Sequence, residues 1–287
     1  MERQVVPLDI KEDWVRDIMC SGIDIVQVGS FVHPVKVPQM ADTDELIKRL
    51  VEDKPSPVTI AGLALNQRGL ERGLECGVEM FCLGASASET HSRKNTGMAS
   101  MDATNRIIIA GQQALAEGKK VQVSVQSAFG CGFEGPVAEA HVLEMATAYV
   151  DAGLFNISLA DTAGHACPVQ VERLFSAVLA LDPRVECTGH FHNTYGLGMA
   201  NVMAALRVGV TSFETSFAGL GGCPFTKAAA GNVATEDFVN ALQLQGLRRD
   251  VNLAQLIDVA GNVAKLFDRE MPGCVYKTGS ILDRRSA

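Results

Sequence analysis

The chain has 287 residues, of which 47% are hydrophobic and 20% are charged, as is usual for a globular protein. Its formal net charge of −8 argues against the basic surface that binding to nucleic-acid phosphates requires. No apolar run approaches the roughly 20 residues of a membrane helix, and the N-terminal MERQ lacks the order of a signal peptide. We therefore expect a cytoplasmic protein with no nucleic-acid or membrane partner.

The cysteines are too sparse for a disulfide scaffold, and none lies in a CxxC or other zinc-binding spacing. We expect most of them to be reduced, because a free cysteine behaves as a small apolar residue. Cys20, Cys76 and Cys82 are predicted to be core residues of this kind.

Short β-branched runs alternate with longer amphipathic stretches along the whole chain, and no linker or low-complexity segment divides it. The pattern predicts strands at 24–31, 57–65, 78–85, 121–129, 155–160, 185–192 and 210–217. It predicts helices at 11–21, 43–52, 68–75, 98–117, 136–151, 168–181, 197–208, 235–244 and 253–267. We therefore expect a single α/β domain over residues 1–287 with a parallel sheet.

The helix ends and the loops favour a TIM (β/α)8 barrel over a doubly wound sheet. Glycine follows many predicted helices, where a helix end needs positive φ, and no GxGxxG or Walker-type loop follows the first strand. Seven strands are one short of closure, and residues 3–8 read as a loop that enters a helix. We expect that the first strand of the barrel lies upstream of Met1 in the natural protein, or that another element covers the gap.

Two histidines stand at the end of a predicted strand, where barrel enzymes carry their catalytic groups. His190 and His192 are two residues apart, so their side chains project to the same face of the strand. This spacing can place two imidazoles on one metal ion. The alternative is a pair of structural histidines.

Two further polar residues could complete such a site. Asp161 follows the strand at 155–160, where it could orient a histidine or a metal-bound water, or take a proton. The alternative for Asp161 is a role in forming the turn or capping the helix. The amide oxygen of Asn232 could join a metal shell, and its alternative is helix capping.

A glycine-rich loop, 218–224, follows the last predicted strand and contains Gly221, Gly222 and Cys223. Mobility of this loop could bring the Cys223 thiol over a substrate. The alternatives are a plain turn and an inert cysteine.

Several segments together resemble the 3-hydroxy-3-methylglutaryl-CoA lyase family, whose members are barrel metal-dependent lyases related to the Claisen-type isopropylmalate and homocitrate synthases. The segments are 161–164 (DTAG), 190–196 (HFHNTYG), 219–224 (GLGGCP) and 231–237 (GNVATED), with 30–34, 37–40, 87–89 and 94–95 in support. The resemblance covers essentially the whole chain. The GLGGCP segment is typical of the lyases and distinguishes them from the synthases.

The resemblance implies a carbon–carbon lyase that cleaves a 3-hydroxy-3-methylglutaryl-CoA-like thioester to acetyl-CoA and a keto acid, acetoacetate. It implies that His190, His192 and Asn232 bind Mg²⁺ or Mn²⁺, hard cations that suit a hydroxyl and a carboxylate oxygen of the substrate. Asp161, with His190 nearby, would help to remove the hydroxyl proton, and Cys223 would protonate the thioester enolate. The residues expected to bind the acyl-CoA substrate are Gln27, Ser158, Gly221 and Gly222. A homodimer is also expected.

The sequence departs from the family pattern at three places. The family's first strand ends in Arg-Asp-Gly, whose aspartate is the fourth metal ligand, and residue 1 falls just after that motif. Gln27 stands where the family commonly has glutamate, and Asn193 follows His192 in place of aspartate. Two alternatives therefore stay open: a Claisen-type synthase or carboxyltransferase-like enzyme, and a catalytically silent barrel.

Overall fold

The computed structural model describes residues 4–35, 37–55, 57–221 and 231–282. Seven parallel strands form one sheet in which each strand pairs with the next along the chain. The strands are β1 (Ile25–Ser30), β2 (Thr59–Leu63), β3 (Met80–Ser86), β4 (Lys120–Gln126), β5 (Asn156–Asp161), β6 (Glu186–Phe191) and β7 (Ser212–Glu214). All seven predicted strands are confirmed. Within the described residues β1 and β7 are the two edges of the sheet and do not pair.

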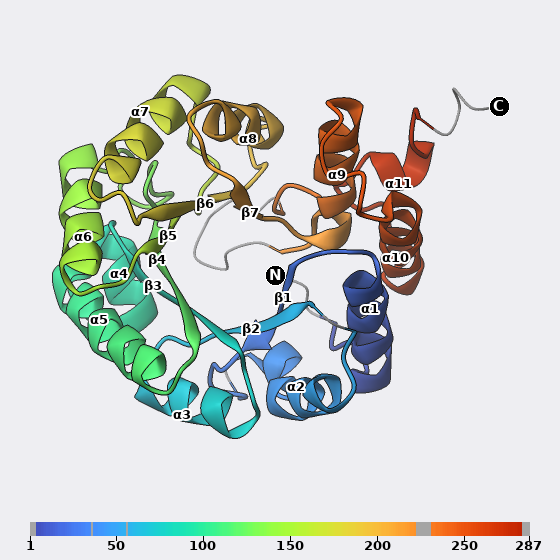
Figure 1. Cartoon of the computed structure of the whole chain (residues 1–287), viewed down its shortest axis with the longest axis horizontal. Coiled ribbons are helices and arrows are strands. Elements are labelled where there is room, and N and C mark those ends of the chain that lie inside the picture. Colours follow the sequence, from blue (N-terminus) through green and yellow to red (C-terminus); the bar gives the residue numbers. More distant parts are fainter. Residues whose placement is uncertain (1–3, 36, 56, 222–230, 283–287) are drawn as a thin grey trace.

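Helices surround the curled sheet, as in a (β/α) barrel (Figure 1). They are α1 (Leu8–Cys20), α2 (Thr43–Glu52), α3 (Gln67–Glu75), α4 (Glu89–Thr96), α5 (Ser100–Ala116), α6 (Glu139–Asp151), α7 (Pro168–Leu179), α8 (Gly198–Arg207), α9 (Thr235–Leu244), α10 (Leu253–Leu266) and α11 (Val275–Thr278). Each predicted helix is confirmed. The short helices α4 and α11 were not predicted, because neither has the long apolar stripe from which helices are inferred.

The strand β7 is much shorter than the predicted 210–217. After Glu214 the backbone leaves the sheet, and Ser216 pairs instead with Ala234. The 3-10 turn Phe217–Gly219 follows, with Ala218 in the left-handed region at φ 57°. This early departure turns residues 218–221 towards residues 231–234 at the mouth of the barrel.

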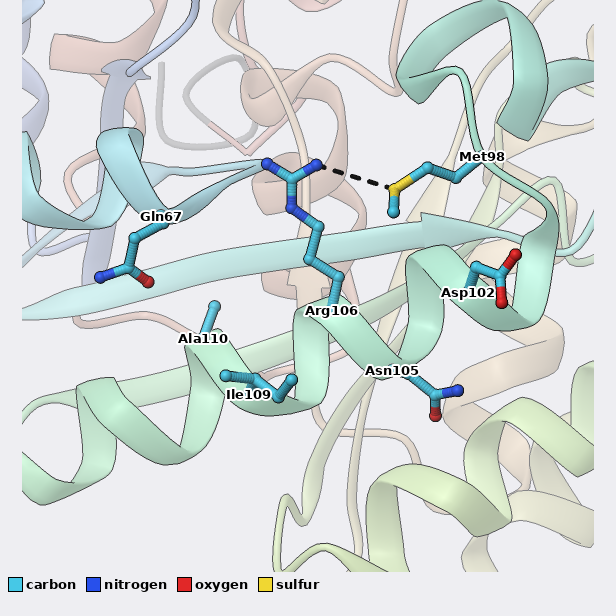
Figure 2. Close-up of a pocket in the computed structure, with 7 residues that line it drawn as sticks. All are labelled: Gln67, Met98, Asp102, Asn105, Arg106, Ile109 and Ala110. Atoms are coloured by element: carbon cyan, nitrogen blue, oxygen red, sulfur yellow. Dashed lines mark hydrogen bonds between the residues drawn. The ribbon is translucent and has the colours of Figure 1, made fainter.

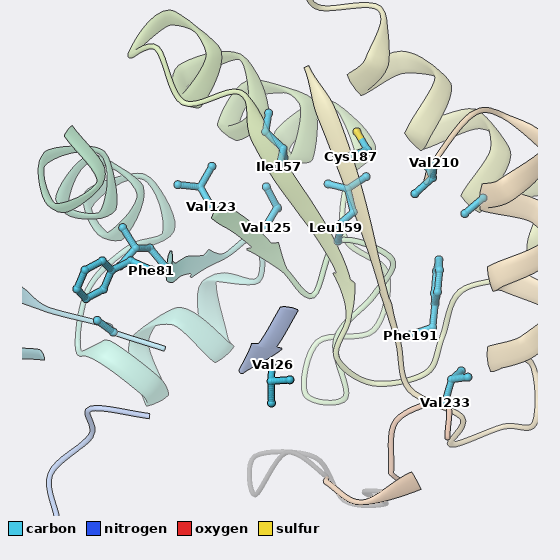
Figure 3. Close-up of a cluster of buried hydrophobic side chains, with 14 of the residues drawn as sticks. Val26, Phe81, Val123, Val125, Ile157, Leu159, Cys187, Phe191, Val210 and Val233 are labelled. Atoms are coloured by element: carbon cyan, nitrogen blue, oxygen red, sulfur yellow. The ribbon is translucent and has the colours of Figure 1, made fainter. Parts of the chain in front are cut away.

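The apolar core lies between the outer face of the sheet and the helices (Figure 3). Val123 and Val125 of β4 and Ile157 and Leu159 of β5 are all fully buried there. Most of the alternate residues on these strands are polar and face the inside of the barrel, where Gln122 Nε2 donates to Thr188 Oγ1 at 3.0 Å. Since side chains alternate along a strand, this division fixes which residues face the barrel interior.

The glycines predicted to end helices adopt the positive φ that this role requires. They are Gly22, Gly77, Gly118, Gly153 and Gly209, with φ between 72° and 98°. No helix in the described part of the chain is long and apolar enough to cross a membrane.

One of the three cysteine predictions is wrong. Cys76 and Cys82 are buried, but Cys20 is exposed. Cys20 is the last residue of α1, and the preceding Met19 and Ile18 face the core. A residue's place on the helical wheel, and not only its apolar character, decides which side it faces.

Candidate metal-dependent active site

The two predicted histidines lie together at the carboxyl end of β6. Phe191 between them is buried in the outer core, so His190 and His192 both project inward. Their ring centroids are 5.3 Å apart, and the ring planes differ by 31°. The predicted shared face is confirmed, and the pair lies at the end of the barrel where catalytic groups gather.

Asn232 is held next to this pair by the backbone. It forms an isolated antiparallel bridge with His192, and its Nδ2 donates to the Leu220 carbonyl at 3.2 Å. A Cβ at Gly221, whose φ is 108°, would lie only 2.6 Å from Asn232 Nδ2, so this approach requires glycine. The Asn232 Oδ1 atom is buried and has no hydrogen-bond partner among the described residues.

These groups fit a divalent metal ion. A buried amide oxygen without a hydrogen-bond partner destabilises the folded state unless it binds a ligand. Asn232 Oδ1 is such an atom, and it lies beside two imidazoles that can bind a metal ion. Within the described residues, no group of three or more His, Cys, Asp or Glu side chains is placed to hold a metal. A cation here would therefore depend on His190, His192 and Asn232, with the remaining positions open to substrate oxygens.

Asp161 is fully buried at the end of β5, and both of its carboxylate oxygens accept hydrogen bonds from the following loop. The donors are the backbone amides of His165, at 2.8 Å, and Ala166, at 3.1 Å. Burial raises the pKa of Asp161 to about 6, although these hydrogen bonds act in the opposite direction. Asp161 therefore stabilises the loop that follows β5, as the turn-forming alternative predicts. Its role as a proton acceptor stays a prediction.

The structure adds one carboxylate to the site that the sequence analysis missed. Glu214, the last residue of β7, contacts His190 Nδ1 through Oε2. Burial by itself would lower the pKa of His190, but the contact with Glu214, the charge of Asp161 and the nearby side chain of Asn232 together outweigh it and raise the pKa. The signal available in the sequence was a single carboxylate within an otherwise uncharged strand.

The predicted substrate-binding residues are only partly described. Ser158 is fully buried on the inner face of β5, and its Oγ has no hydrogen-bond partner in the described structure. Gln27 is exposed on β1, on the opposite face from the buried Val26. Gly221 lies against Asn232. Gly222 and Cys223 lie outside the described residues.

Asn193, one of the departures from the family pattern, has a structural contact. Its Oδ1 accepts a hydrogen bond from the Gly198 amide at 3.0 Å, where α8 begins. An amide oxygen can fill this position as well as a carboxylate, so aspartate is not needed for the turn.

The outer surface carries a separate cavity of about 470 Å³ between α3 and α5 (Figure 2). It is lined by Gln67, Met98, Asp102, Asn105, Arg106, Ile109 and Ala110. None of the predicted site residues lines it. The candidate catalytic residues at the strand ends therefore do not belong to this cavity.

Comparison with known proteins decides the family. The HMGL-like family profile matches residues 3–263. The chain belongs to the HMGL-like family. Hydroxymethylglutaryl-CoA lyase YngG of Bacillus subtilis is 34% identical over 262 residues, which are 91% of this chain and 87% of that protein. The (R)-citramalyl-CoA lyase of Chloroflexus aurantiacus is 32% identical over 288 residues, which are 98% of this chain and 91% of that protein.

A solved structure in the HMGL-like family is similar over almost the whole chain. An HMG-CoA lyase from Acinetobacter baumannii, in complex with coenzyme A and 3-methylmalate, has a TM-score of 0.92 and 35% identity. The match covers 99% of this chain and 92% of that chain. The predicted barrel fold, the resemblance to this family and the carbon–carbon lyase class are confirmed, while the roles of individual residues stay predictions.

A second buried carboxylate supports the segment that leads into the family's glycine-rich loop. Glu236 of α9 is fully buried, and its Oε2 accepts a hydrogen bond from the strained Ala218 amide at 3.0 Å. Its Oε1 has no partner in the described structure, and a Cβ at Gly273 would lie 2.2 Å from it. Burial raises the pKa of Glu236 to about 7.

This carboxylate makes a testable contribution to pH-dependent stability. The pKa rises from 4.5 to about 7 on folding, so between these pH values the native state holds a proton that the unfolded state has lost. The free energy of unfolding should therefore fall as pH rises through this range, by on the order of 3 kcal/mol from Glu236 alone. Glu236→Gln should remove this part of the slope, as measured by urea unfolding at several pH values.

The control is Glu75→Gln, which neutralises an exposed carboxylate at the end of α3. Because Asp161 also contributes a slope, the informative quantity is the difference between the wild type and each variant. If the free energy of unfolding depends on pH equally in the wild type and in Glu236→Gln, folding does not raise the pKa of Glu236.

Proposed function

We propose that the chain is a metal-dependent lyase that cleaves a 3-hydroxy-3-methylglutaryl-CoA-like thioester to acetyl-CoA and acetoacetate. The observation that carries the proposal is the convergence of His190, His192 and Asn232 at the carboxyl end of the barrel, where the buried Oδ1 of Asn232 has no hydrogen-bond partner among the described residues. Relatives named hydroxymethylglutaryl-CoA lyase support the substrate, and the Acinetobacter lyase complex supports a coenzyme A thioester.

His190, His192 and Asn232 would hold Mg²⁺ or Mn²⁺. When bound, the cation would stabilise negative charge on the hydroxyl and carboxylate oxygens of the substrate. Two neutral imidazoles and an amide bring no negative charge of their own, so the substrate oxygens supply it. This donor set favours a chelating, anionic substrate over a neutral one.

The proposed reaction needs one proton acceptor and one proton donor. Asp161, with His190 nearby, takes the proton of the tertiary hydroxyl, and the C–O bond becomes a carbonyl as the adjacent C–C bond breaks. The electron pair of that bond passes to the thioester fragment as an enolate. Cys223 then protonates the enolate carbon to give acetyl-CoA, and acetoacetate is the other product.

The remaining predicted residues would shape the substrate site. Ser158 offers a buried hydroxyl on the inner face of β5, and Gln27 offers an uncharged amide on β1. Gly221 and Gly222 would let the loop backbone approach the thioester closely, because they have no side chain. The homodimer and the cytoplasmic location stay predictions, and the first can be measured by sedimentation.

A second substrate has specific support. The Chloroflexus (R)-citramalyl-CoA lyase matches over 98% of this chain, so its substrate belongs in the same assay. The two thioesters differ in the acyl group beyond the cleaved bond. The ratio of their kcat/KM values would decide which acyl group the site prefers.

The test is acetyl-CoA release by the full chain from 3-hydroxy-3-methylglutaryl-CoA and from (R)-citramalyl-CoA, with Mg²⁺ or Mn²⁺ and with a chelator. We expect metal-dependent release that the chelator abolishes. Condensation of acetyl-CoA with a 2-keto acid, without cleavage, would favour the synthase. Metal binding without either reaction on these substrates would favour the silent barrel.

A further inference from the structure

The pairing of the last two strands places Glu214 beside His190. The register of β6 and β7 sets Thr188 opposite Ser212 and His190 opposite Glu214. The intervening Phe213 packs against Phe238 of α9, with ring centroids 5.2 Å apart, so its neighbour Glu214 faces the barrel interior. The strand register therefore fixes this neighbour of His190.

The Glu214 carboxylate contacts one of the two ring nitrogens of His190. Oε2 contacts Nδ1, and the two side chains are 29% and 25% exposed. An imidazole whose Nδ1–H is donated to a carboxylate keeps Nε2 as its only atom for binding a metal or a proton.

The second carboxylate near His190, that of the buried Asp161, binds other groups. Both oxygens of Asp161 accept backbone amides of its own loop. Asp161 influences His190 only through its charge, whereas Glu214 makes the direct contact. Orientation of the His190 ring therefore depends on Glu214.

We propose that Glu214 is a positioning residue that fixes the ring orientation of His190 and keeps its Nδ1 protonated, so that Nε2 is presented as a ligand at the barrel mouth. The proposal rests on the proposed function only in taking His190 as a metal ligand. It assigns to Glu214 the orienting role that the sequence analysis considered for Asp161.

The first experiment measures Mn²⁺ binding by electron paramagnetic resonance, without any thioester. Glu214→Leu removes the acceptor at similar volume, and we expect it to weaken Mn²⁺ binding on the order of 10- to 100-fold. Glu214→Gln retains an acceptor without the charge and should give a smaller loss. Glu186→Gln, at the opposite, exposed end of β6, is the matched control and should bind as the wild type does.

The second experiment separates positioning from general destabilisation. The nitrogen-15 spectrum of the His190 ring, recorded with Mg²⁺ bound, should report a protonated Nδ1 in the wild type and loss of that single state in Glu214→Leu. In acetyl-CoA release, kcat should fall more than KM rises. A thermal midpoint close to the wild-type value would show that Glu214→Leu is folded.

Wild-type Mn²⁺ affinity and an unchanged His190 spectrum in folded Glu214→Leu would overturn the proposal. That result is compatible with full lyase activity, so it leaves the proposed function standing. Conversely, Mn²⁺ binding that depends on Glu214 in a chain that cleaves neither thioester would support the positioning role and contradict the proposed function.

Discussion

Replacing His192 by alanine is expected to abolish the dependence of acetyl-CoA release on divalent cation. His192 lies on the same face as His190, and its backbone holds Asn232, so the alanine variant removes an imidazole but keeps the backbone pairing. Loss of one of the three proposed protein ligands should lower kcat/KM by at least about 100-fold, since even residues that only orient a ligand can cost 10- to 100-fold. The measurement is the rate of release as a function of Mg²⁺ and Mn²⁺ concentration.

The control for His192→Ala is His141→Ala. His141 lies on α6, in the layer of helices outside the sheet, where it contacts Glu144 and Ser100. Its loss should leave the metal dependence unchanged. Mg²⁺ activation that persists in His192→Ala would show that the ligands are assigned wrongly.

Replacing Cys223 by serine is expected to lower turnover with little change in KM. A proton donor to the enolate acts only after the C–C bond has begun to break, so its removal affects the transition state and not ground-state binding. The fall in kcat should be on the order of 100- to 10,000-fold, the range for general acid catalysis. Steady-state kinetics of acetyl-CoA release measures both constants.

The chain offers a matched cysteine for comparison. Cys167 is exposed at the start of α7, at a helix N-cap where serine is well suited. Cys167→Ser should therefore keep wild-type turnover. A Cys223→Ser variant with the same turnover would remove Cys223 from the mechanism, while a large rise in KM alone would make it a binding residue.

The fold could be predicted from local patterns because each unit of the barrel repeats the same physical signals. An apolar run, a glycine at the helix end and an amphipathic helix recur along the chain, and the structure has strands and helices at each predicted place. The prediction was less accurate where tertiary contacts decide. Strand β7 ends at Glu214 because Ser216 pairs with Ala234, which is far along the chain.

The candidate site was also predicted only in part, where local sequence patterns decide the geometry. The shared face of His190 and His192 follows from the two-residue period of a strand, so the sequence determined it by itself. The approach of Asn232 to His192 could not be derived from spacing, because it depends on a backbone bridge between residues that are 40 positions apart in the chain. For Asp161, sequence spacing left two roles open, and the loop amides that occupy its oxygens are visible only in the structure.

We could infer the barrel class, the order of its elements, the paired histidines and the family from the sequence alone, because these depend on local periodicity and on motifs contiguous in the chain. The carboxylate that contacts His190 became known only from the structure, since it follows from the register of β6 against β7. The tertiary structure also decided that Glu236 is buried beneath Ala218, a contact between residues 18 positions apart. Ionisable groups respond to every charge and dipole that folding brings near them, so their environment is a property of the assembled barrel.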